Sequence, residues 1–182
     1  EDYPDNPIPP YKDDEMTELI GSIRTNGIIE PLLVRPHGEQ YQIINGRNRR
    51  NAAKLAGYNS VPCIVRDMND DDAVIQLAET IFTQRNVSRI STMQKARTYR
   101  LWLEALKRQG RRTDLTSSPL GMKMQTLDIV GQEVGESRNQ IHRYIRLTYL
   151  ISELQDIVDK GKPEFSFRAA VLIFFLSEAN QT

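Results

Sequence analysis

The chain contains few of the residues that form disulfides or zinc sites. It has one cysteine, Cys63, and two histidines among 182 residues. A lone cysteine excludes a disulfide within the chain, and two histidines leave a Cys/His zinc site short of ligands. Long apolar runs are also missing, because the longest, residues 169–176, is far shorter than the roughly 20 residues of a membrane helix. No export signal is present. We therefore expect a cytoplasmic protein without a metal site and, because the numbering begins at Glu1 rather than Met, a fragment of a longer chain.

The chain also has no net charge, because its 24 Lys and Arg residues balance its 24 Asp and Glu residues. This balance argues against a protein that binds polyanions through its overall charge. The charges are nevertheless segregated. Residues 46–66 carry five basic and no acidic side chains, residues 83–125 carry ten basic and two acidic ones, and residues 1–45 and 67–82 are acidic. Two basic blocks favour an anionic ligand, although a charged block is often only a solvated surface.

Hydrophobic periodicity predicts an α+β fold in which a small mixed α/β domain, residues 1–90, precedes an all-helical domain, residues 91–182. The first domain should contain three strands, at 32–35, 41–44 and 61–65, and helices at 13–26 and 47–56. A third helix should begin at the acidic residues 69–72 and carry an apolar face as far as Ile81. We expect the apolar stripe of the first helix to cover the sheet, and Cys63 to be an inert buried thiol in the last strand.

The helical domain should begin with a long helix that ends at Gly110. Residues 111–125 are rich in Ser, Thr, Gly and Pro and show no apolar period, which predicts a linker-like loop. Further helices are expected after it, at 127–134, 137–145, 150–158 and 167–177.

Residues 127–146 have the pattern of a helix-turn-helix. Two closely crossing helices require a small residue at the crossing and a turn residue that tolerates positive φ, which Gly131 and Gly135 supply. Val130, Val134 and Ile141 fall on the inner faces, and Ser137 stands where an N-cap belongs. Any packed helix pair with a glycine turn would share part of this pattern.

The outer face of the second helix is polar and almost free of acids. Its side chains suit base edges and phosphates, because Asn and Gln match adenine, and Arg matches guanine or the backbone. The predicted DNA contacts are Ser137, Arg138, Asn139, Gln140, His142 and Arg143, with Arg111, Arg112 and Lys123 nearby on phosphates.

A second basic motif, Gly46-Arg47-Asn48-Arg49-Arg50, follows a strand and opens a helix. A flexible residue, free backbone N–H groups and guanidinium groups at a helix start are typical of a phosphate site. The same composition is also common on solvated helix starts.

Several segments resemble the ParB/Spo0J partition family of the ParB/sulfiredoxin superfamily. The family's N-terminal domain is similar to residues 27–35 (GIIEPLLVR), 41–57 (YQIINGRNRRNAAKLAG) and 61–67 (VPCIVRD), and its central helix-turn-helix domain is similar to residues 134–141 and 144–147. The similarity is greatest to ParB-type proteins of plasmids and conjugative elements.

The resemblance implies a bacterial, nucleoid- or plasmid-associated protein that binds double-stranded DNA at a centromere-like or operator site, in segregation or regulation. It also implies a homodimer formed through a C-terminal domain absent from this chain, a ParA-type ATPase partner and no membrane partner. Family members with complete motifs bind and hydrolyse CTP with Mg²⁺. The nucleotide- or anion-binding residues that it implies here are Gly27, Pro31, Gly46, Arg47, Asn48, Arg49, Arg50, Gln84 and Arg85.

Two nucleotide motifs depart from the family. Its Gly-Glu-Arg-Arg-x-Arg-Ala box aligns with residues 46–52, where Arg47 replaces the glutamate and Asn48 and Asn51 replace two arginines. Its Glu-Asn-x-Gln-Arg motif falls within residues 79–85, with Ile81-Phe82 or Thr80-Ile81 in place of Glu-Asn. Apolar residues supply no oxygen ligands for Mg²⁺, so we expect no catalytic residues and no CTP hydrolysis. Sulfiredoxin chemistry is not expected either, because it needs a cysteine in the basic turn.

Three hypotheses follow for the function. The first is a sequence-specific DNA-binding protein of the ParB partition type. The second is a nucleotide-hydrolysing DNA clamp or a nuclease that uses residues 46–50. The third is a protein-protein adaptor that keeps the fold without reading DNA.

Overall fold

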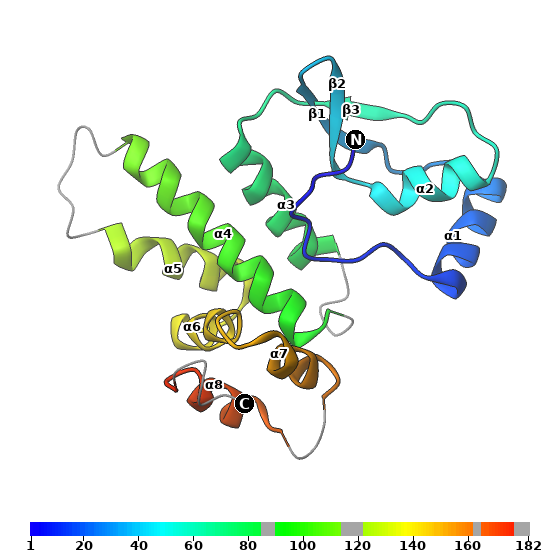
Figure 1. Ribbon diagram of the computed structural model, residues 1–182. Helices are drawn as coiled ribbons and strands as arrows, with labels where there is room; N and C mark the ends of the chain where they lie inside the picture. The colour runs from blue at the N-terminus through cyan, green and yellow to red at the C-terminus, as the bar shows by residue number, and fades with distance from the viewer. Residues whose placement is uncertain (85–89, 114–121, 162–164, 177–182) are drawn as a thin grey trace. The chain divides into compact units, whose positions relative to one another are not determined.

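The computed structural model describes residues 1–84, 90–113, 122–161 and 165–176, with side chains for all of these except Gln84, 111–113 and 122–126. The chain separates into two compact units, Glu1–Leu77 and Ala78–Thr182. The division falls inside helix α3 (Asp70–Gln84), which begins in the first unit and ends in the second (Figure 1). The α+β fold class predicted from the sequence is confirmed.

A three-stranded sheet forms the centre of the first unit. Strand β1 (Leu32–His37) lies in the middle, antiparallel to β2 (Gln40–Asn45) and parallel to β3 (Cys63–Val65). A register shift between Leu33 and Val34 marks an irregularity in the antiparallel pair. Leu32, Val34 and Ile44 are almost fully buried. Figure 1 shows helix α2 (Arg47–Leu55) beside the sheet, as the connection that the parallel pair of β1 and β3 requires.

The apolar stripe of helix α1 (Asp13–Asn26) packs mainly on α2 rather than on the sheet. Ile23 of α1 forms a buried cluster with Ala52 and Ala53 of α2, and Met16, Leu19 and Ile20 pack against it. The helix itself and its inner face were predicted correctly, but its partner was not. Small alanine side chains let the two helices approach closely, and the sequence does not state which apolar surface a stripe will meet.

The prediction that Cys63 is buried was wrong. Cys63 is exposed, and its neighbours Ile64 and Val65 are 47% and 51% exposed. The reason is the strand order β2-β1-β3, which makes β3 an edge strand. An apolar run is typical of a strand covered on both faces, but a short edge strand can leave such side chains at the surface.

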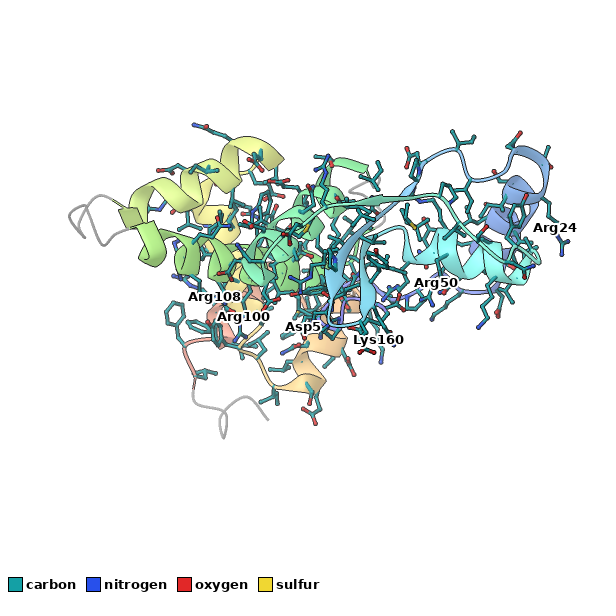
Figure 2. The ribbon with its side chains drawn as sticks, turned by 90° about the horizontal axis from the view of Figure 1, so that it is seen from above. Asp5, Arg24, Arg50, Arg100, Arg108 and Lys160 are labelled. Carbon is teal, nitrogen blue, oxygen red and sulfur yellow. The ribbon has the colours of Figure 1, made fainter. Side chains whose placement is uncertain are left out.

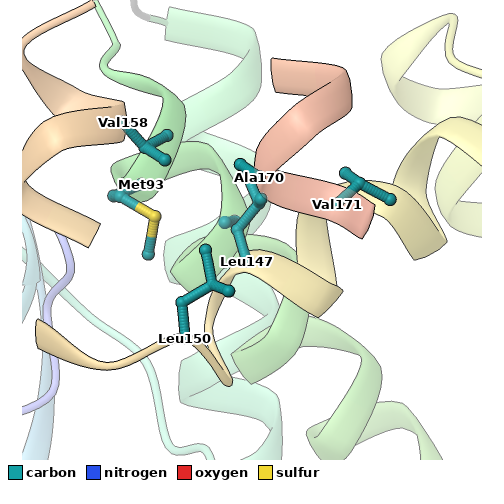
Figure 3. Close-up of a cluster of buried hydrophobic side chains, with 7 residues drawn as sticks. Met93, Leu147, Leu150, Val158, Ala170 and Val171 are labelled. Carbon is teal, nitrogen blue, oxygen red and sulfur yellow. The ribbon is translucent and has the colours of Figure 1, made fainter. Parts of the chain in front are cut away.

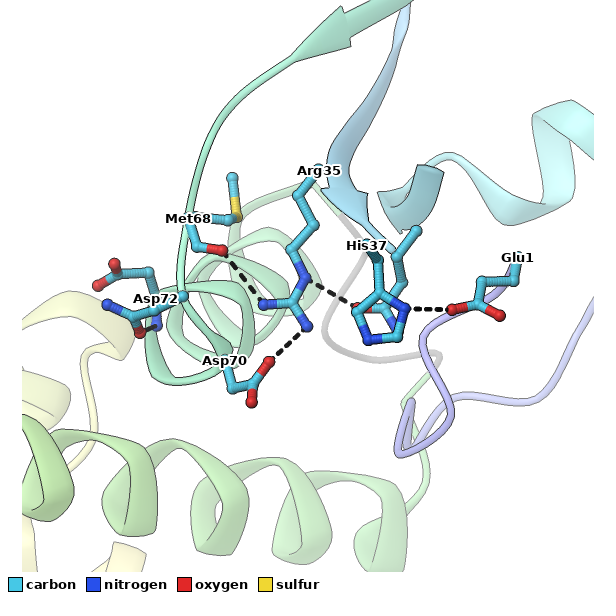
Figure 4. Close-up of polar contacts among 8 residues, drawn as sticks. Glu1, Arg35, His37, Met68, Asp70 and Asp72 are labelled. Carbon is cyan, nitrogen blue, oxygen red and sulfur yellow. Dashed lines mark hydrogen bonds and ion pairs between the residues drawn. The ribbon is translucent and has the colours of Figure 1, made fainter. Parts of the chain in front are cut away.

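A buried arginine fixes the start of α3 to the sheet (Figure 4). Arg35 of β1 is 4% exposed, and its Nε donates to Gln42 Oε1 at 2.9 Å. Its guanidinium group also donates to the Met68 carbonyl and to Asp70 Oδ1, at 3.2 and 2.6 Å. A buried charge is tolerated because these acceptors satisfy it. The contacts join β1, β2 and the first turn of α3.

Gly46, between β2 and α2, has φ of 102°, and a Cβ atom there would lie 2.8 Å from Leu32 Cγ. Gly46→Ala should therefore lower the free energy of unfolding of the first unit by about 2–3 kcal/mol, from backbone strain and steric overlap. Gly57→Ala is the matched control, because φ is 91° there but nothing lies within 4 Å. Hydrogen exchange of peptides covering β1 and α2 measures both variants. Equal effects would show that the approach to Leu32 contributes nothing.

The second unit is helical. After the end of α3 it contains five further described helices: α4 (Thr92–Thr113), α5 (Met122–Val134), α6 (Arg138–Leu147), α7 (Ser152–Asp159) and α8 (Phe167–Ile173). None of the helices in the described ranges is both long and apolar enough to span a bilayer. The predicted domain boundary at residue 90 stays a prediction.

Helix α4 continues past Gly110 to Thr113, and α5 already begins at Met122. The predicted loop at residues 111–125 is therefore helical at both ends, and residues 114–121 lie outside the described residues. A helix tolerates one interior glycine at a cost of about 1 kcal/mol, so a glycine alone does not end it.

Helix α4 carries the core of the second unit. Met93 and Ala96 of α4 are fully buried with Leu147, Leu150 and residues of α7 and α8 (Figure 3). Further along α4, the rings of Tyr99 and Trp102 stack on Phe82 of α3. Helices α5, α6 and α7 thus pack on α4, and α8 packs mainly on α6 and α7.

Candidate functional site

Helices α5 and α6 form the helix-turn-helix that the sequence predicts. Gly135, in the turn, has φ of 69°. At Gly131 of α5 a Cβ atom would lie 2.7 Å from the Glu136 carbonyl oxygen, so the close approach of helix and turn requires glycine. Val130 and Ile141 are 1% and 0% exposed on the inner faces. The crossing position, the turn position and the core positions Val130 and Ile141 are therefore confirmed, whereas Val134 is only partly buried.

Ser137 caps α6. Its φ and ψ are −70° and 148°, and its Oγ accepts a hydrogen bond from the Gln140 backbone N–H at 3.2 Å. A serine cap of this kind stabilises a helix start by about 1 kcal/mol. The cap fixes where α6 begins, and thereby which side chains face outward.

The outward face of α6 is a concave polar surface. Asn139, His142, Arg143 and Arg146 line a hollow of about 300 Å³. Asn139, His142 and Arg143 are exposed, whereas Arg138 and Gln140 are partly buried. We name the four lining residues the α6 face. The predicted contact residues of α6 therefore share one helix, but the hollow collects only three of them.

The electrostatics of the α6 face are positive. The pKa of His142 is lowered from 6.5, first by burial and then by the charges of Arg138, Arg146 and Lys107. Cations of α4 and α6 therefore surround the imidazole and disfavour its protonated form. An anion bound there would relieve this repulsion.

A second hollow, of about 570 Å³, lies between α6 and α8. Its polar lining consists of Arg143, Arg146 and Arg168, and its apolar lining is Phe167, Val171, Leu172 and Phe175. Among the residues that the structure describes, no acidic side chain lines either hollow, and the three arginines form no ion pair. Arginines at a concave surface without a carboxylate partner are suited to a phosphate or another oxyanion.

Arg146 is held in place by aromatic rings. Its guanidinium carbon lies 5.8 Å from the Phe174 ring centroid and 5.1 Å from that of Phe175. Such cation–π contacts restrict the Arg146 side chain. They leave its guanidinium N–H groups available to a hydrogen-bond acceptor. Both hollows share this arginine.

Sequence reasoning missed Arg146 and Arg168. Arg146 follows Asn139, His142 and Arg143 at helical spacing, so the period of α6 could have revealed it. Arg168 had no such signal, because its position depends on how α8 packs against α6. Arg111 and Arg112 lie in the last turn of α4 and Lys123 in the first turn of α5, with their side chains outside the described residues.

The basic turn at residues 46–50 is occupied by contacts within the chain. Arg49 Nη1 donates to the carbonyl oxygens of Glu30 and Pro31 and lies 3.4 Å from the Glu30 carboxylate. Arg50 Nη2 lies 2.6 Å from Asp2 Oδ1 (Arg50 is labelled in Figure 2).

The other two side chains of the turn hold the segment that precedes α1. Arg47 Nη2 donates to the Ile8 carbonyl oxygen, and the Tyr11 backbone N–H donates to Asn48 Oδ1 at 3.1 Å. Ile8 is buried. The basic turn therefore fastens the N-terminal segment to the first unit.

The contacts within the chain engage a nitrogen atom each of Arg47, Arg49 and Arg50 and the side-chain oxygen of Asn48, whereas the buried Nε of Arg50 has no hydrogen-bond partner. In the described part of the chain no three His, Cys, Asp or Glu side chains form a group that could hold a metal ion. Gly27 ends α1 with φ of 69°. The side chain of Gln84 and all of Arg85 lie outside the described residues.

The two units define a class of protein: a small mixed α/β unit followed in the chain by a helical unit with a helix-turn-helix. Residues 2–81 match the ParB N-terminal domain family. The chain thus contains a ParB N-terminal domain, and it is similar over most of its length to partition proteins of the ParB/Spo0J family.

The relatives include chromosome-partitioning proteins. The chain is 30% identical over 170 residues to the chromosome-partitioning protein Spo0J of Thermus thermophilus, covering 93% of this chain and 55% of that protein. It is 32% identical over 161 residues to the stage 0 sporulation protein J of Bacillus subtilis, covering 86% and 49%. The chain thus spans about half the length of these curated relatives.

A solved structure supports the fold. The C-terminally truncated chromosome-partitioning protein ParB from Caulobacter crescentus, crystallised with the centromeric parS site, matches with a TM-score of 0.59 and 23% identity. The match covers 98% of this chain and 82% of that one. At this identity the similarity supports the architecture and not the roles of individual residues.

Proposed function

We propose that this chain binds double-stranded DNA sequence-specifically through α6, as part of a ParB-type protein that acts in segregation of a chromosome, plasmid or mobile element. The observation that carries the proposal is the α6 face, in which an amide, an imidazole and two guanidinium groups line one hollow without an acidic side chain. A helix that projects such groups can enter the major groove and meet base edges. The relatives' partitioning function supports the biological context.

The residues that line the two hollows suit two kinds of DNA contact, to bases and to backbone phosphates. Asn139 and Arg143 have the donors and acceptors that distinguish bases, whereas Arg168 on α8 lies beside the reading helix and suits a backbone phosphate. Arg138 and Gln140 at the start of α6 are close to the helix N-terminus, which also favours phosphate. Arg111, Arg112 and Lys123 remain proposed phosphate contacts.

The experiment that tests this function is a selection from random duplexes at about 150 mM salt, followed by anisotropy titrations at several salt concentrations. We expect an enriched motif and an affinity that falls as salt rises. Equal binding to all duplexes would favour an adaptor that keeps the fold without reading DNA, and no binding at all would overturn DNA binding itself.

Binding should also take up a proton at His142. Its pKa is below 6.5 in the free protein because of burial and the neighbouring cations, and phosphates would raise it on binding. The affinity should therefore increase roughly two- to tenfold as the pH falls from about 7.5 to about 5.5. His142→Gln should remove the increase, as measured by anisotropy across this pH range. An unchanged pH dependence in the variant would contradict proton uptake at His142.

Two further partners are proposed from the similarity to partition proteins alone. One is a second copy of the protein, bound through a domain outside this chain, and the other is a ParA-type ATPase.

A further inference from the structure

An ion pair joins α4 to the turn that precedes α6. Lys95 Nζ lies 2.9 Å from Glu136 Oε1, and the two side chains are only 16% and 19% exposed. Glu136 directly precedes the cap residue Ser137, and its backbone N–H donates to the Gly131 carbonyl oxygen at 3.1 Å. Glu136 therefore lies where α4, α5 and the start of α6 come together.

Lys95 also contacts α6 beyond its first turn. Its ammonium lies 5.2 Å from the centroid of the Tyr144 ring, and that ring packs on Tyr99 of α4 and Phe167 of α8, with centroids 5.6 and 5.0 Å apart. One side chain of α4 thus touches the residue before α6 and a residue two turns into it. Two separated contacts restrain both the start of α6 and its rotation about its own axis.

Burial makes this pair sensitive to change. Burial, the Glu136 carboxylate and Tyr144 raise the pKa of Tyr99, whose ring is buried beside Tyr144. Removing one partner of a largely buried ion pair leaves the other charge without compensation. The turn would then have to move so that the remaining charge reaches water.

The negative charge of Glu136 also indicates what the residue does. Glu136 stands next to the helix that carries the cationic α6 face, where a carboxylate opposes binding of any polyanion. The presence of Glu136 at this position is explained if it helps to orient α6 and does not contribute to DNA affinity.

We propose that Lys95 is a positioning residue for sequence reading: its contacts with Glu136 and Tyr144 set the orientation in which α6 presents Asn139 and Arg143. This inference rests on the proposed DNA-binding function. It assigns the role to α4, outside the helix-turn-helix itself.

The test compares Lys95→Met, Glu136→Gln, the double variant and Lys95→Arg. For each, the dissociation constant is measured by anisotropy on the selected duplex and on a scrambled duplex of equal length and salt. Unfolding of the second unit is followed by fluorescence of Trp102, the chain's one tryptophan. Hydrogen exchange of the peptide covering α6 is measured without DNA.

We expect each single variant to lower the ratio of specific to nonspecific affinity by about three- to thirtyfold. The double variant should lose no more than either single one, because the partners act as a unit. Lys95→Arg should keep the ratio within about twofold, since a guanidinium group can make the same ion pair. Exchange in α6 should be faster in Lys95→Met and unchanged in Lys95→Arg.

Four results would overturn the inference. If Lys95 contacted a phosphate directly, Lys95→Met would weaken both duplexes alike and Glu136→Gln would strengthen both. If the pair served stability alone, the variants would unfold more easily but keep the wild-type ratio and the wild-type exchange of α6. A wild-type chain that prefers no duplex would overturn both this inference and the proposed function, whereas a wild-type preference that survives in Lys95→Met would overturn the inference alone.

Discussion

Gly131→Ala is expected to lower the free energy of unfolding of the second unit by about 2–4 kcal/mol and to abolish DNA reading. The added Cβ would lie 2.7 Å from the Glu136 carbonyl oxygen, which is backbone and has no rotamer to adopt. The turn would have to move away from α5, taking the start of α6 with it. Gly131 is helical, so alanine would otherwise be the better helix former. The steric contact must therefore reverse the sign of an ordinary glycine-to-alanine change.

Gly135→Asn is the matched control in the same turn. Gly135 has φ of 69° with nothing within 4 Å, and asparagine adopts this region more easily than other L residues. Its cost should stay below about 1 kcal/mol. Denaturant unfolding followed by Trp102, which is 2% exposed, measures both variants. Equal midpoints for Gly131→Ala and the wild type would show that α5 and the turn do not approach as closely as described.

The double variant Asn139→Ala/Arg143→Gln is expected to lose about 2–5 kcal/mol of binding free energy on the preferred duplex. Both side chains line the α6 face and are exposed, so the fold does not depend on them. Binding to a scrambled duplex should weaken much less, because phosphate contacts from other residues remain. The sequence preference, rather than all binding, should disappear.

Lys160→Gln is the control for lost positive charge. Lys160 follows α7, is exposed, and lines neither of the two hollows (Figure 2). Its replacement should change either affinity by no more than about twofold. Anisotropy titrations of wild type, control and double variant on both duplexes provide the comparison. A similar loss of preference in Lys160→Gln would attribute the effect to net charge instead of placed groups.

The helix-turn-helix could be predicted because its signals are local. Gly131, Gly135, Ser137 and Ile141 each answer a requirement that arises within about twenty residues of chain, and the structure places all of them as expected. The polar outer face follows from the helical period alone. The local pattern therefore identified α6 as the helix with the polar outer face before any tertiary contact was known.

The misplaced features depend on contacts between distant segments. Cys63 was expected to be buried because an apolar strand resembles a central one, and only the strand order shows that β3 is at the edge. Composition also could not show that the basic turn fastens the N-terminal segment, because Asp2 and Arg50 are far apart in sequence. Arg168 joins Arg143 and Arg146 through the packing of α8, which no period encodes.

The nucleotide hypothesis also depends on contacts between segments that are distant in the sequence. The phosphate site at residues 46–50 was predicted from the glycine and arginine residues of this segment alone. In the structure Arg49 bonds to the Glu30 and Pro31 carbonyl oxygens, and Arg50 to Asp2. An anion that bound to these nitrogen atoms would have to displace their partners within the chain.

The central claim, that the outer face of α6 reads DNA sequence, is tested most directly by selecting preferred duplexes from one random pool with two proteins in parallel. The proteins are the wild type and the Asn139→Ala/Arg143→Gln variant. The account predicts that the wild type enriches one motif and that the variant enriches none, or a motif altered at the positions that α6 meets. The same motif enriched by both proteins, or no motif enriched by the wild type, would contradict it.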